Sequence, residues 1–126
     1  MAKQFSKRLQ TSQPEVVQNL FSSFHPINLW ITKRILPEVP VALLALPGKA
    51  GALSRSRVLK WLSPQWIHPY FSDVNFNFIL KQHHGGRKVN VWTVNDKEKM
   101  KLLIDSSIDG LITDDPSLVW DILEQQ

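Results

Sequence analysis

Cysteine is absent from the 126 residues. Its absence excludes disulfides, a thiol nucleophile and a thiolate metal site, and it is compatible with a reducing compartment. Long apolar runs are missing too. The longest, residues 39–46, has the length of a strand and contains Pro40, whereas a membrane-spanning helix needs about 20 residues. The lysines near the start have no apolar block behind them, as a secretory signal would. We therefore expect a soluble, cytoplasmic protein without a transmembrane segment.

Acidic residues are few in most of the chain. Residues 1–101 contain fifteen basic and five acidic side chains, a formal charge of +10. Residues 102–126 contain six acidic side chains and no basic one. A basic body can bind nucleic acid or anionic lipid. Here the bases are scattered over several predicted elements without a dense run, which favours a solvated basic surface. No nucleic-acid partner is expected.

The apolar content is sufficient for the hydrophobic core of one folded domain, since 43% of the residues are hydrophobic and five are tryptophan. Short apolar runs alternate with segments of helical length, which is typical of βα units around a parallel sheet. The pattern predicts strands at 16–24, 41–46, 66–68, 88–94 and 111–113, and helices at 2–10, 27–36, 54–62, 73–83, 97–105 and 117–124. Five βα units thus follow one another, with no linker long enough to divide domains.

Polar residues mark where several of these helices begin. Ser54, Asp73 and Asp115 are predicted N-caps, because each precedes an amphipathic segment and carries an oxygen that can accept from the first turn. Asn95 ends the fourth strand, and Glu98 follows three residues later, which resembles a capping box at the start of the helix 97–105.

Ligands of parallel α/β proteins bind at the carboxyl ends of the strands. The residues expected there are Ser23, Phe24, His25, Leu46, Pro47, His68, Tyr70, Trp92, Asn95, Thr113, Asp114 and Asp115. Trp92 could be either a layer of the core or a platform for a substrate. Asp114 and Asp115 most simply serve the N-terminus of the last helix, and Asn95 is likewise a cap first.

The four histidines have ordinary structural explanations. His25 and His68 each precede a proline, an arrangement common where a strand leaves the sheet, and both are expected to be polar loop residues. His83 and His84 end the helix 73–83 on the edge opposite the strand exits, where cations stabilise a helix C-terminus.

No catalytic metal centre is expected from this composition. Ca²⁺ or Mg²⁺ needs several converging oxygens, and the only acids before Asp96 are Glu15, Glu38 and Asp73, none of them at a strand exit. The sequence has neither a Glu-x-Asp pair nor a glycine-rich phosphate loop. The aspartate pair before the last helix would hold a hard cation poorly and repel a phosphate. We predict no catalytic and no metal-ligating residue in this chain.

Two blocks near the end carry a family resemblance. Residues 91–95 read VWTVN and residues 108–116 read IDGLITDDP. Together they resemble the terminal "VWTVN … DGIITDDP" signature of glycerophosphodiester phosphodiesterases. Residues 22–24 read SSF and are similar to a middle strand of that family. The resemblance extends over residues 14–124, and these two blocks are its specific part.

The resemblance implies a (β/α)₈ barrel of which residues 1–126 supply strands four to eight, the N-terminal catalytic part being absent. The family hydrolyses glycerophosphodiesters to glycerol phosphate and an alcohol in lipid metabolism, with a divalent metal (Ca²⁺ or Mg²⁺). Its acid/base histidines, the first in a His-Arg-Gly motif, and its Glu-x-Asp and Glu-x-Lys metal ligands lie on the first three strands, and this chain has none of them. Trp92 matches the family tryptophan that walls the glycerol side of the pocket, and His68 is expected to line the pocket too. The isolated chain is therefore expected to be inactive.

Five strands cannot close a barrel at normal geometry, so the first and last strands would expose unpaired edges. Four interpretations follow. The chain is part of a full enzyme, complements a separate N-terminal half-barrel chain, self-associates through its edges, or is a non-catalytic module that binds an anionic surface through its basic body. The sequence favours a truncated or split phosphodiesterase first and a binding module last.

Overall fold

The computed structural model describes residues 19–56, 59–62 and 65–126. In chain order the elements are β1 (Phe21–Ser23), α2 (Pro26–Ile35), β2 (Val41–Ala45), the 3-10 helix η2 (Gly48–Gly51), α3 (Ala52–Arg55), β3 (Trp66–Pro69), the 3-10 helix η4 (Phe71–Asp73), α4 (Phe76–His84), β4 (Lys88–Val91), α5 (Lys97–Asp105), β5 (Gly110–Leu111) and α6 (Pro116–Glu124). The predicted helix 2–10 and the first residues of the strand predicted at 16–24 lie outside the described residues.

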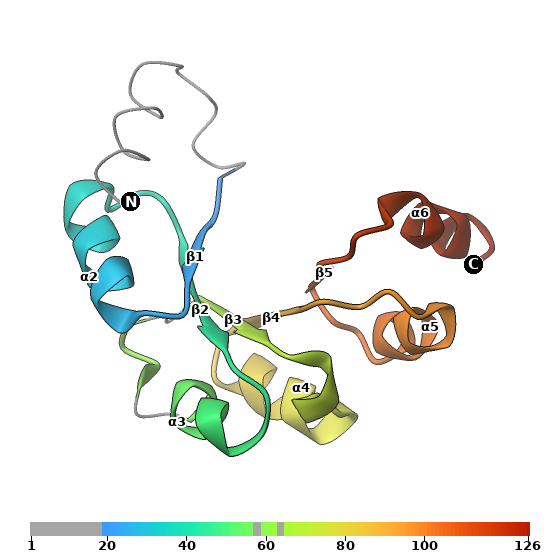
Figure 1. The fold of residues 1–126 in the computed structure, drawn as a ribbon, viewed down its shortest axis with the longest axis horizontal. Coiled ribbons are helices and arrows are strands. Elements are labelled where there is room, and N and C mark those ends of the chain that lie inside the picture. The colour runs from blue at the N-terminus through green and yellow to red at the C-terminus, as the bar shows by residue number, and fades with distance from the viewer. Residues whose placement is uncertain (1–18, 57–58, 63–64) are drawn as a thin grey trace.

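All five strands run parallel, and their spatial order β1-β2-β3-β4-β5 is their order along the chain. Each of the first four strands is therefore followed by a helical crossover that returns the chain to the start of the next strand. Figure 1 shows the helices around the outside of the sheet, from α2 on the left through α3 and α4 below to α5 and α6 on the right. This arrangement confirms the predicted fold class, α/β with five parallel βα units.

The core lies between the sheet and the helices. Leu43, Ile67 and Val89 are aligned in register across β2, β3 and β4, and all three are fully buried. They belong to the same apolar cluster as Leu29 of α2 and Met100 of α5. Side chains alternate between the two faces of a strand, so every second residue of β3 and β4 faces the opposite side of the sheet. In the described part of the chain no helix is long and apolar enough to cross a membrane.

The helix predicted at 54–62 is wrong. The helix here is α3, which follows η2 directly and spans only Ala52–Arg55, and residues 60–62 form a turn. The chain turns back on itself here, so that a Cβ on Gly51 would lie 1.8 Å from the carbonyl oxygen of Leu46. Only glycine permits that approach. The tight turn after β2 therefore fixes where α3 begins.

Three predicted N-caps are also wrong. Ser54 lies inside α3, and the N-cap position of that helix is Gly51. Asn75, not Asp73, caps α4, and its side chain accepts a hydrogen bond from the backbone N–H of Phe78 at 2.9 Å. Asp96, not Asn95, caps α5 and accepts from the backbone N–H of Lys99 at 2.9 Å. Asp73 and Asn95 make tertiary hydrogen bonds instead, and those bonds hold loops at the carboxyl edge of the sheet.

Strand lengths differ from the prediction as well. The described part of the first strand covers Phe21–Ser23, β4 stops at Val91 and is followed by a single bridge between Trp92 and Tyr70, and β5 has only two residues. Past the ends of β4 and β5 the backbone N–H of Val94 still donates to the carbonyl oxygen of Ile112 at 2.9 Å, and the polar side chains that follow bond to one another, as described below.

Candidate substrate-binding site

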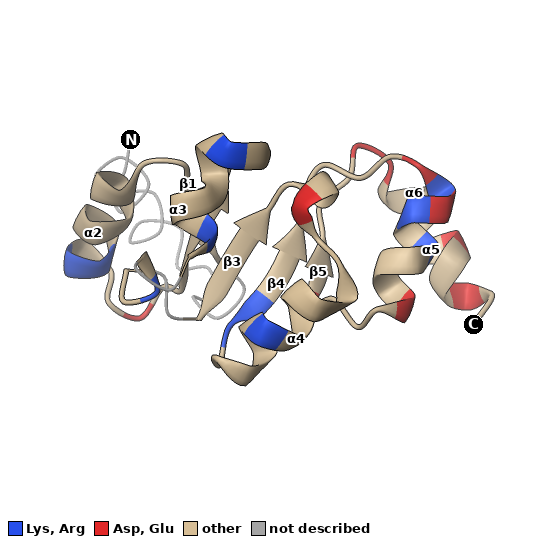
Figure 2. Cartoon of the chain, turned by 90° about the horizontal axis from the view of Figure 1, so that it is seen from below, with Lys and Arg blue, Asp and Glu red and all other residues tan. Residues whose placement is uncertain are grey.

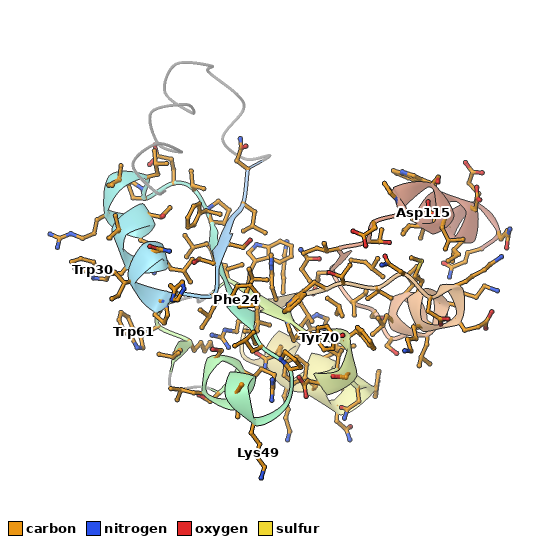
Figure 3. All side chains as sticks on the ribbon, viewed as in Figure 1. Phe24, Trp30, Lys49, Trp61, Tyr70 and Asp115 are labelled. Atoms are coloured by element: carbon orange, nitrogen blue, oxygen red, sulfur yellow. The ribbon has the colours of Figure 1, made fainter. Side chains whose placement is uncertain are left out.

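Because the strands are parallel, their carboxyl ends meet at one edge of the sheet, and three aromatic rings lie together there. The rings of Trp92 and Phe24 are 5.5 Å apart at 80°, and those of Trp92 and Tyr70 are 5.1 Å apart at 69°. Both are edge-to-face geometries, which aromatic quadrupoles favour. We call Phe24, Tyr70 and Trp92 the aromatic wall; Figure 3 shows Phe24 and Tyr70 close to each other near the middle of the molecule.

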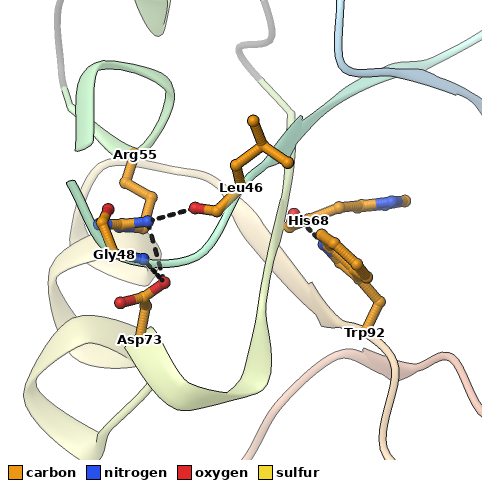
Figure 4. Close-up of polar contacts among 6 residues, drawn as sticks. All are labelled: Leu46, Gly48, Arg55, His68, Asp73 and Trp92. Carbon is orange, nitrogen blue, oxygen red and sulfur yellow. Dashed lines mark hydrogen bonds and ion pairs between the residues drawn. The ribbon is translucent and has the colours of Figure 1, made fainter. Parts of the chain in front are cut away.

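The indole of Trp92 is held in a fixed orientation. Its Nε1–H donates a hydrogen bond of 2.8 Å to the carbonyl oxygen of His68 (Figure 4). That N–H is the only polar group of the side chain, so Trp92 has only its ring surface to offer a ligand. Such a surface suits the C–H face of a small polyol and does not suit a charged phosphate.

His68 lies on the same face of the sheet, directly before the aromatic wall, and is 2% exposed. Burial lowers the pKa of its imidazole to about 4, so the ring is neutral at pH 7. Its Nε2 is 3.3 Å from the amide nitrogen of Asn90. Because that amide can only donate, Nε2 accepts and the proton sits on Nδ1. His68 is therefore buried in the sheet and is not the loop residue expected.

Two buried polar atoms on this face have no hydrogen-bond partner among the described residues, Nδ1 of His68 and Oδ1 of Asn90. With the tautomer above, the first is a donor and the second an acceptor. Unpaired buried polar atoms are rare in folded proteins and call for an explanation such as water, a ligand or another chain segment. This face of the sheet therefore retains hydrogen-bonding capacity that the described chain does not use.

Asn90 also explains a glycine in the second signature block. A Cβ on Gly110 would lie 2.7 Å from Oδ1 of Asn90, which is shorter than such contacts allow. Asn90 and Gly110 are paired in register between β4 and β5. The absence of a side chain at Gly110 thus makes room for the asparagine next to His68.

An ion pair joins the loops that follow β2 and β3. Nη1 of Arg55 is 3.0 Å from Oδ2 of Asp73 and also donates to the carbonyl oxygen of Leu46 at 2.9 Å. Its Nη2 donates to the carbonyl oxygen of Gly48, whose N–H in turn donates to Asp73 (Figure 4). The two charged side chains are largely shielded from solvent. This loop clamp was not predicted, because nothing in an 18-residue sequence separation signals a contact.

A second network joins the ends of β4 and β5. Oδ1 of Asn95 accepts from Oγ1 of Thr113 and from the backbone N–H of Asp114, both at 3.0 Å, and its amide donates to Oδ2 of Asp114 at 2.8 Å. Asp115 caps α6 as predicted: its Oδ1 accepts from the hydroxyl of Ser117 and from the N–H of Leu118. Hydrogen bonds, that from Ser117 first, lower the pKa of Asp115. Both aspartates are thus engaged within the chain, and Asp114 serves Asn95 and not the helix.

The remaining histidines lie away from the aromatic wall or make local bonds. His83 does more than end α4: its Nε2 is 2.7 Å from Oδ2 of Asp109, and the same oxygen accepts from the N–H of Val89 at 2.8 Å. This pairing joins α4, β4 and the turn before β5 at the amino edge of the sheet. His25 is exposed, and its backbone N–H donates to Oγ of Ser23.

The residues in hand do not fit a catalytic divalent metal. In the ranges that the structure describes, no three histidine, cysteine, aspartate or glutamate side chains lie close enough to hold a cation. Asp73 is paired with Arg55, while Asp114 and Asp115 are bonded to neighbouring polar groups.

The sequence placed Phe24 and Tyr70, the two ring partners of Trp92, at the carboxyl edge of the sheet but gave them no role. The signal for them was an aromatic residue directly after a strand.

The sequence model of the glycerophosphoryl diester phosphodiesterase family matches residues 1–118. The chain belongs to this family. A glycerophosphodiester phosphodiesterase from Caldanaerobacter subterraneus subsp. tengcongensis is 26% identical over 106 residues, which cover 84% of this chain and 42% of that protein. The recognised signature blocks are therefore part of a similarity that extends over most of the chain.

Solved structures of the family share the fold. A glycerophosphodiester phosphodiesterase from Parabacteroides distasonis superposes with a TM-score of 0.81 at 23% identity, over 98% of this chain and 50% of that one. A phosphodiesterase from Oleispira antarctica, solved in complex with the product sn-glycerol-3-phosphate, gives a TM-score of 0.70 at 23% identity over 83% of this chain and 41% of that one. The chain thus spans about half or less of the proteins it matches and corresponds to half of a (β/α) barrel.

Proposed function

We propose that this chain is the carboxy-terminal half-barrel of a glycerophosphodiester phosphodiesterase and that Trp92 packs against the glycerol moiety of the substrate. The observation that carries the proposal is the position of Trp92 at the carboxyl edge, with its N–H bonded to His68 and its ring left for contact. Glycerol phosphate, the product bound in the Oleispira structure, has the small polyol surface that such a ring suits.

We further propose that hydrolysis needs a front half-barrel, on a second polypeptide or in a longer chain. Cleaving a phosphodiester requires a group that activates the attacking water, a group that protonates the departing alkoxide, and stabilisation of negative charge on the phosphoryl oxygens. His68 is neutral and buried, and the carboxylates at the carboxyl edge are bonded internally. The back half would therefore bind and orient, while proton transfer and metal binding would come from the front half.

The open face of the sheet supports a missing partner. The outer strands β1 and β5 have three and two residues and each pairs on one side within the described sheet. The unpaired Nδ1 of His68 and Oδ1 of Asn90 lie on the face that a barrel would enclose. A front half-barrel would close the sheet and bring polar groups or ordered water to these two atoms.

The proposal is tested by complementation. The chain would be mixed with the front half-barrel of the Caldanaerobacter relative, and hydrolysis of glycerophosphocholine would be followed with Mg²⁺ or Ca²⁺ present. We expect no hydrolysis by the chain or the front half alone and metal-dependent hydrolysis by the mixture. The relative's own back half is the positive control for the assay. Metal-dependent hydrolysis by this chain with nothing added would refute the proposed division of labour.

A further inference from the structure

An apolar groove lies between α2 and residues 59–62. Its volume is about 200 Å³, and the residues that line it are all apolar: Pro26, Ile27, Trp30, Leu59, Trp61 and Leu62. Ile27 is 71% exposed, Trp61 66% and Trp30 47%. Figure 3 shows Trp30 and Trp61 near each other at the left margin of the molecule, away from the body of the fold. Large apolar side chains gathered at the surface in this way mark a site of contact with something other than water.

Two basic side chains contact the tryptophans that line the groove. The guanidinium of Arg34 lies 4.8 Å from the ring centre of Trp30, and Nζ of Lys33 donates to the carbonyl oxygen of Trp61 at 3.4 Å. Between residues 19 and 62 the sequence has six bases and one acid, Glu38. Figure 2 shows lysine and arginine on α2, α3, α4, β4 and α5, whereas most aspartate and glutamate lie toward α5 and α6. The groove thus lies on a side of the molecule whose sequence is rich in bases and poor in acids.

We propose that this groove and its basic rim, Lys33 and Arg34, dock onto an anionic lipid surface. Tryptophan prefers the boundary between headgroups and acyl chains, where its ring is buried and its N–H stays hydrated. Arginine and lysine pack their stems on apolar groups and extend their charges to lipid phosphates. The rings of Trp30 and Trp61 provide the first contribution, and Lys33 and Arg34 beside them provide the second on the same surface. The proposal stands on this surface alone and does not depend on catalysis.

The groove adjoins the edge of the sheet that carries the candidate site. Pro26 and Ile27 form the first turn of α2, which begins three residues after β1 ends at Ser23. Phe24 of the aromatic wall lies in that connection. Docking through the groove would therefore bring the carboxyl edge of the sheet close to the lipid surface. A substrate or product that carries a lipid-derived glycerol would then be near the site.

Vesicle binding tests the proposal with the 126-residue chain. Co-sedimentation would be measured with phosphatidylcholine vesicles, with and without phosphatidylglycerol, at low and high salt. We expect binding only where phosphatidylglycerol is present, with weakening at high salt because exposed charges are screened. The tryptophan emission should shift to the blue on binding. No binding by a chain whose circular dichroism shows it to be folded would overturn the proposal.

Two pairs of matched variants distinguish vesicle binding through the groove from non-specific binding by exposed tryptophan or lysine. Trp30→Ser with Trp61→Ser should weaken binding roughly tenfold or more, from the apolar area that is no longer buried. Trp120→Ser is the control, because Trp120 is 65% exposed but lies on α6. Lys33→Gln with Arg34→Gln should weaken binding about thirtyfold, at roughly tenfold per 1.4 kcal/mol. Lys97→Gln with Lys101→Gln on α5 is its control and should leave binding within about twofold, since those lysines belong to a different element from the groove and its rim.

A second copy of the chain is the competing occupant. Sedimentation equilibrium of the native chain and the Trp30→Ser, Trp61→Ser variant would show whether the groove holds a dimer together. A dimer that this variant abolishes, in a native chain that ignores vesicles, would assign the groove to self-association and refute lipid docking. Equal loss of vesicle binding in the Trp120→Ser control would refute it as well.

Discussion

At the scale of single residues, Trp92 packs against neighbouring rings and also leaves part of its own ring exposed for contact with a ligand. It touches Phe24 and Tyr70 and bonds to the carbonyl of His68, yet it remains only partly buried. Part of the ring is therefore committed to the fold and part is exposed at the edge where ligands of parallel α/β proteins bind. Its contact with a substrate stays a prediction, and kinetics can separate the two roles.

Trp92→Ala should raise the KM for a glycerophosphodiester in the complemented enzyme by about tenfold or more, from loss of apolar contact with the substrate. Trp92→Phe is the matched control, because it keeps a ring but removes the N–H that bonds to His68. The phenylalanine variant should retain most of the substrate affinity. Unfolding by urea would be measured for both. A stability loss with unchanged kinetics in the alanine variant would show that Trp92 is only a packing residue.

His68 makes stability depend on pH. Burial lowers the pKa of the folded state from 6.5 to about 4, so the unfolded chain takes up the proton first as the pH falls. The contribution of the neutral ring is present above about pH 6.5 and is lost as the pH falls toward 4, up to about 3 kcal/mol. The free energy of unfolding would be compared between the native chain and His68→Gln at pH 7 and pH 4. The native chain should exceed His68→Gln in free energy of unfolding by less at pH 4 than at pH 7. The same difference in free energy at both pH values would contradict a buried neutral histidine.

Gly110→Ala tests the close approach of Asn90. The new methyl group would lie 2.7 Å from Oδ1 of the asparagine, and crowding of this kind typically costs about 1–3 kcal/mol. Gly85→Ala is the control, because the nearest atom to its Cβ would be the mobile end of Lys60 at 3.3 Å. Chemical denaturation should show a clear loss for the first variant and a small effect for the second. Equal stability of both would mean that Asn90 moves aside freely.

At the scale of elements, the loops at the carboxyl edge are held by side chains that cross from one βα unit to the next. Arg55 after β2 reaches Asp73 after β3, and Asn95 after β4 reaches Thr113 and Asp114 after β5. In each pair a polar side chain of one loop bonds to its neighbour. The site therefore depends on contacts between units as well as on the individual strand exits.

A double-mutant cycle measures the loop clamp. Arg55→Met and Asp73→Asn should each destabilise the chain, and the pair should show a coupling of about 1–2 kcal/mol, because charge-assisted hydrogen bonds are involved and the side chains are largely shielded. The pair Lys101→Met and Glu98→Gln is the control, since those side chains are exposed and 3.9 Å apart. Additive effects at Arg55 and Asp73 would show that the two loops are held independently.

At the scale of the whole molecule, an open sheet predicts association. In the described chain the outer strands β1 and β5 each pair on one side only, and the inner face of the sheet is uncovered. Unpaired strand edges can pair with the strands of another chain. Light scattering after size exclusion should show concentration-dependent association of the chain alone. Addition of a front half-barrel should replace it with a one-to-one complex. A clean monomer at every concentration would argue against exposed pairing edges.

The sequence by itself determined the order of the five strands, the positions of α2, α4, α5 and α6, and the family. Alternating apolar runs identified the five strands because strand and helix periodicities are local properties of the chain, and the blocks at 91–95 and 108–116 identified the family because they are contiguous. The cap at Asp115 was predicted correctly for the same reason: its partners are two and three residues away.

Only the tertiary structure decided which polar residues are free to act as caps. Asp73 and Asn95 have suitable side chains at suitable positions, but Arg55 and the loop at 113–114 engage them first. The burial of His68 and the aromatic wall around Trp92 were likewise beyond the sequence, because each depends on residues that are 22 to 68 positions apart and become neighbours only when parallel strands align. Local patterns fix what each segment forms, whereas hydrogen-bond competition and burial are properties of the assembled sheet.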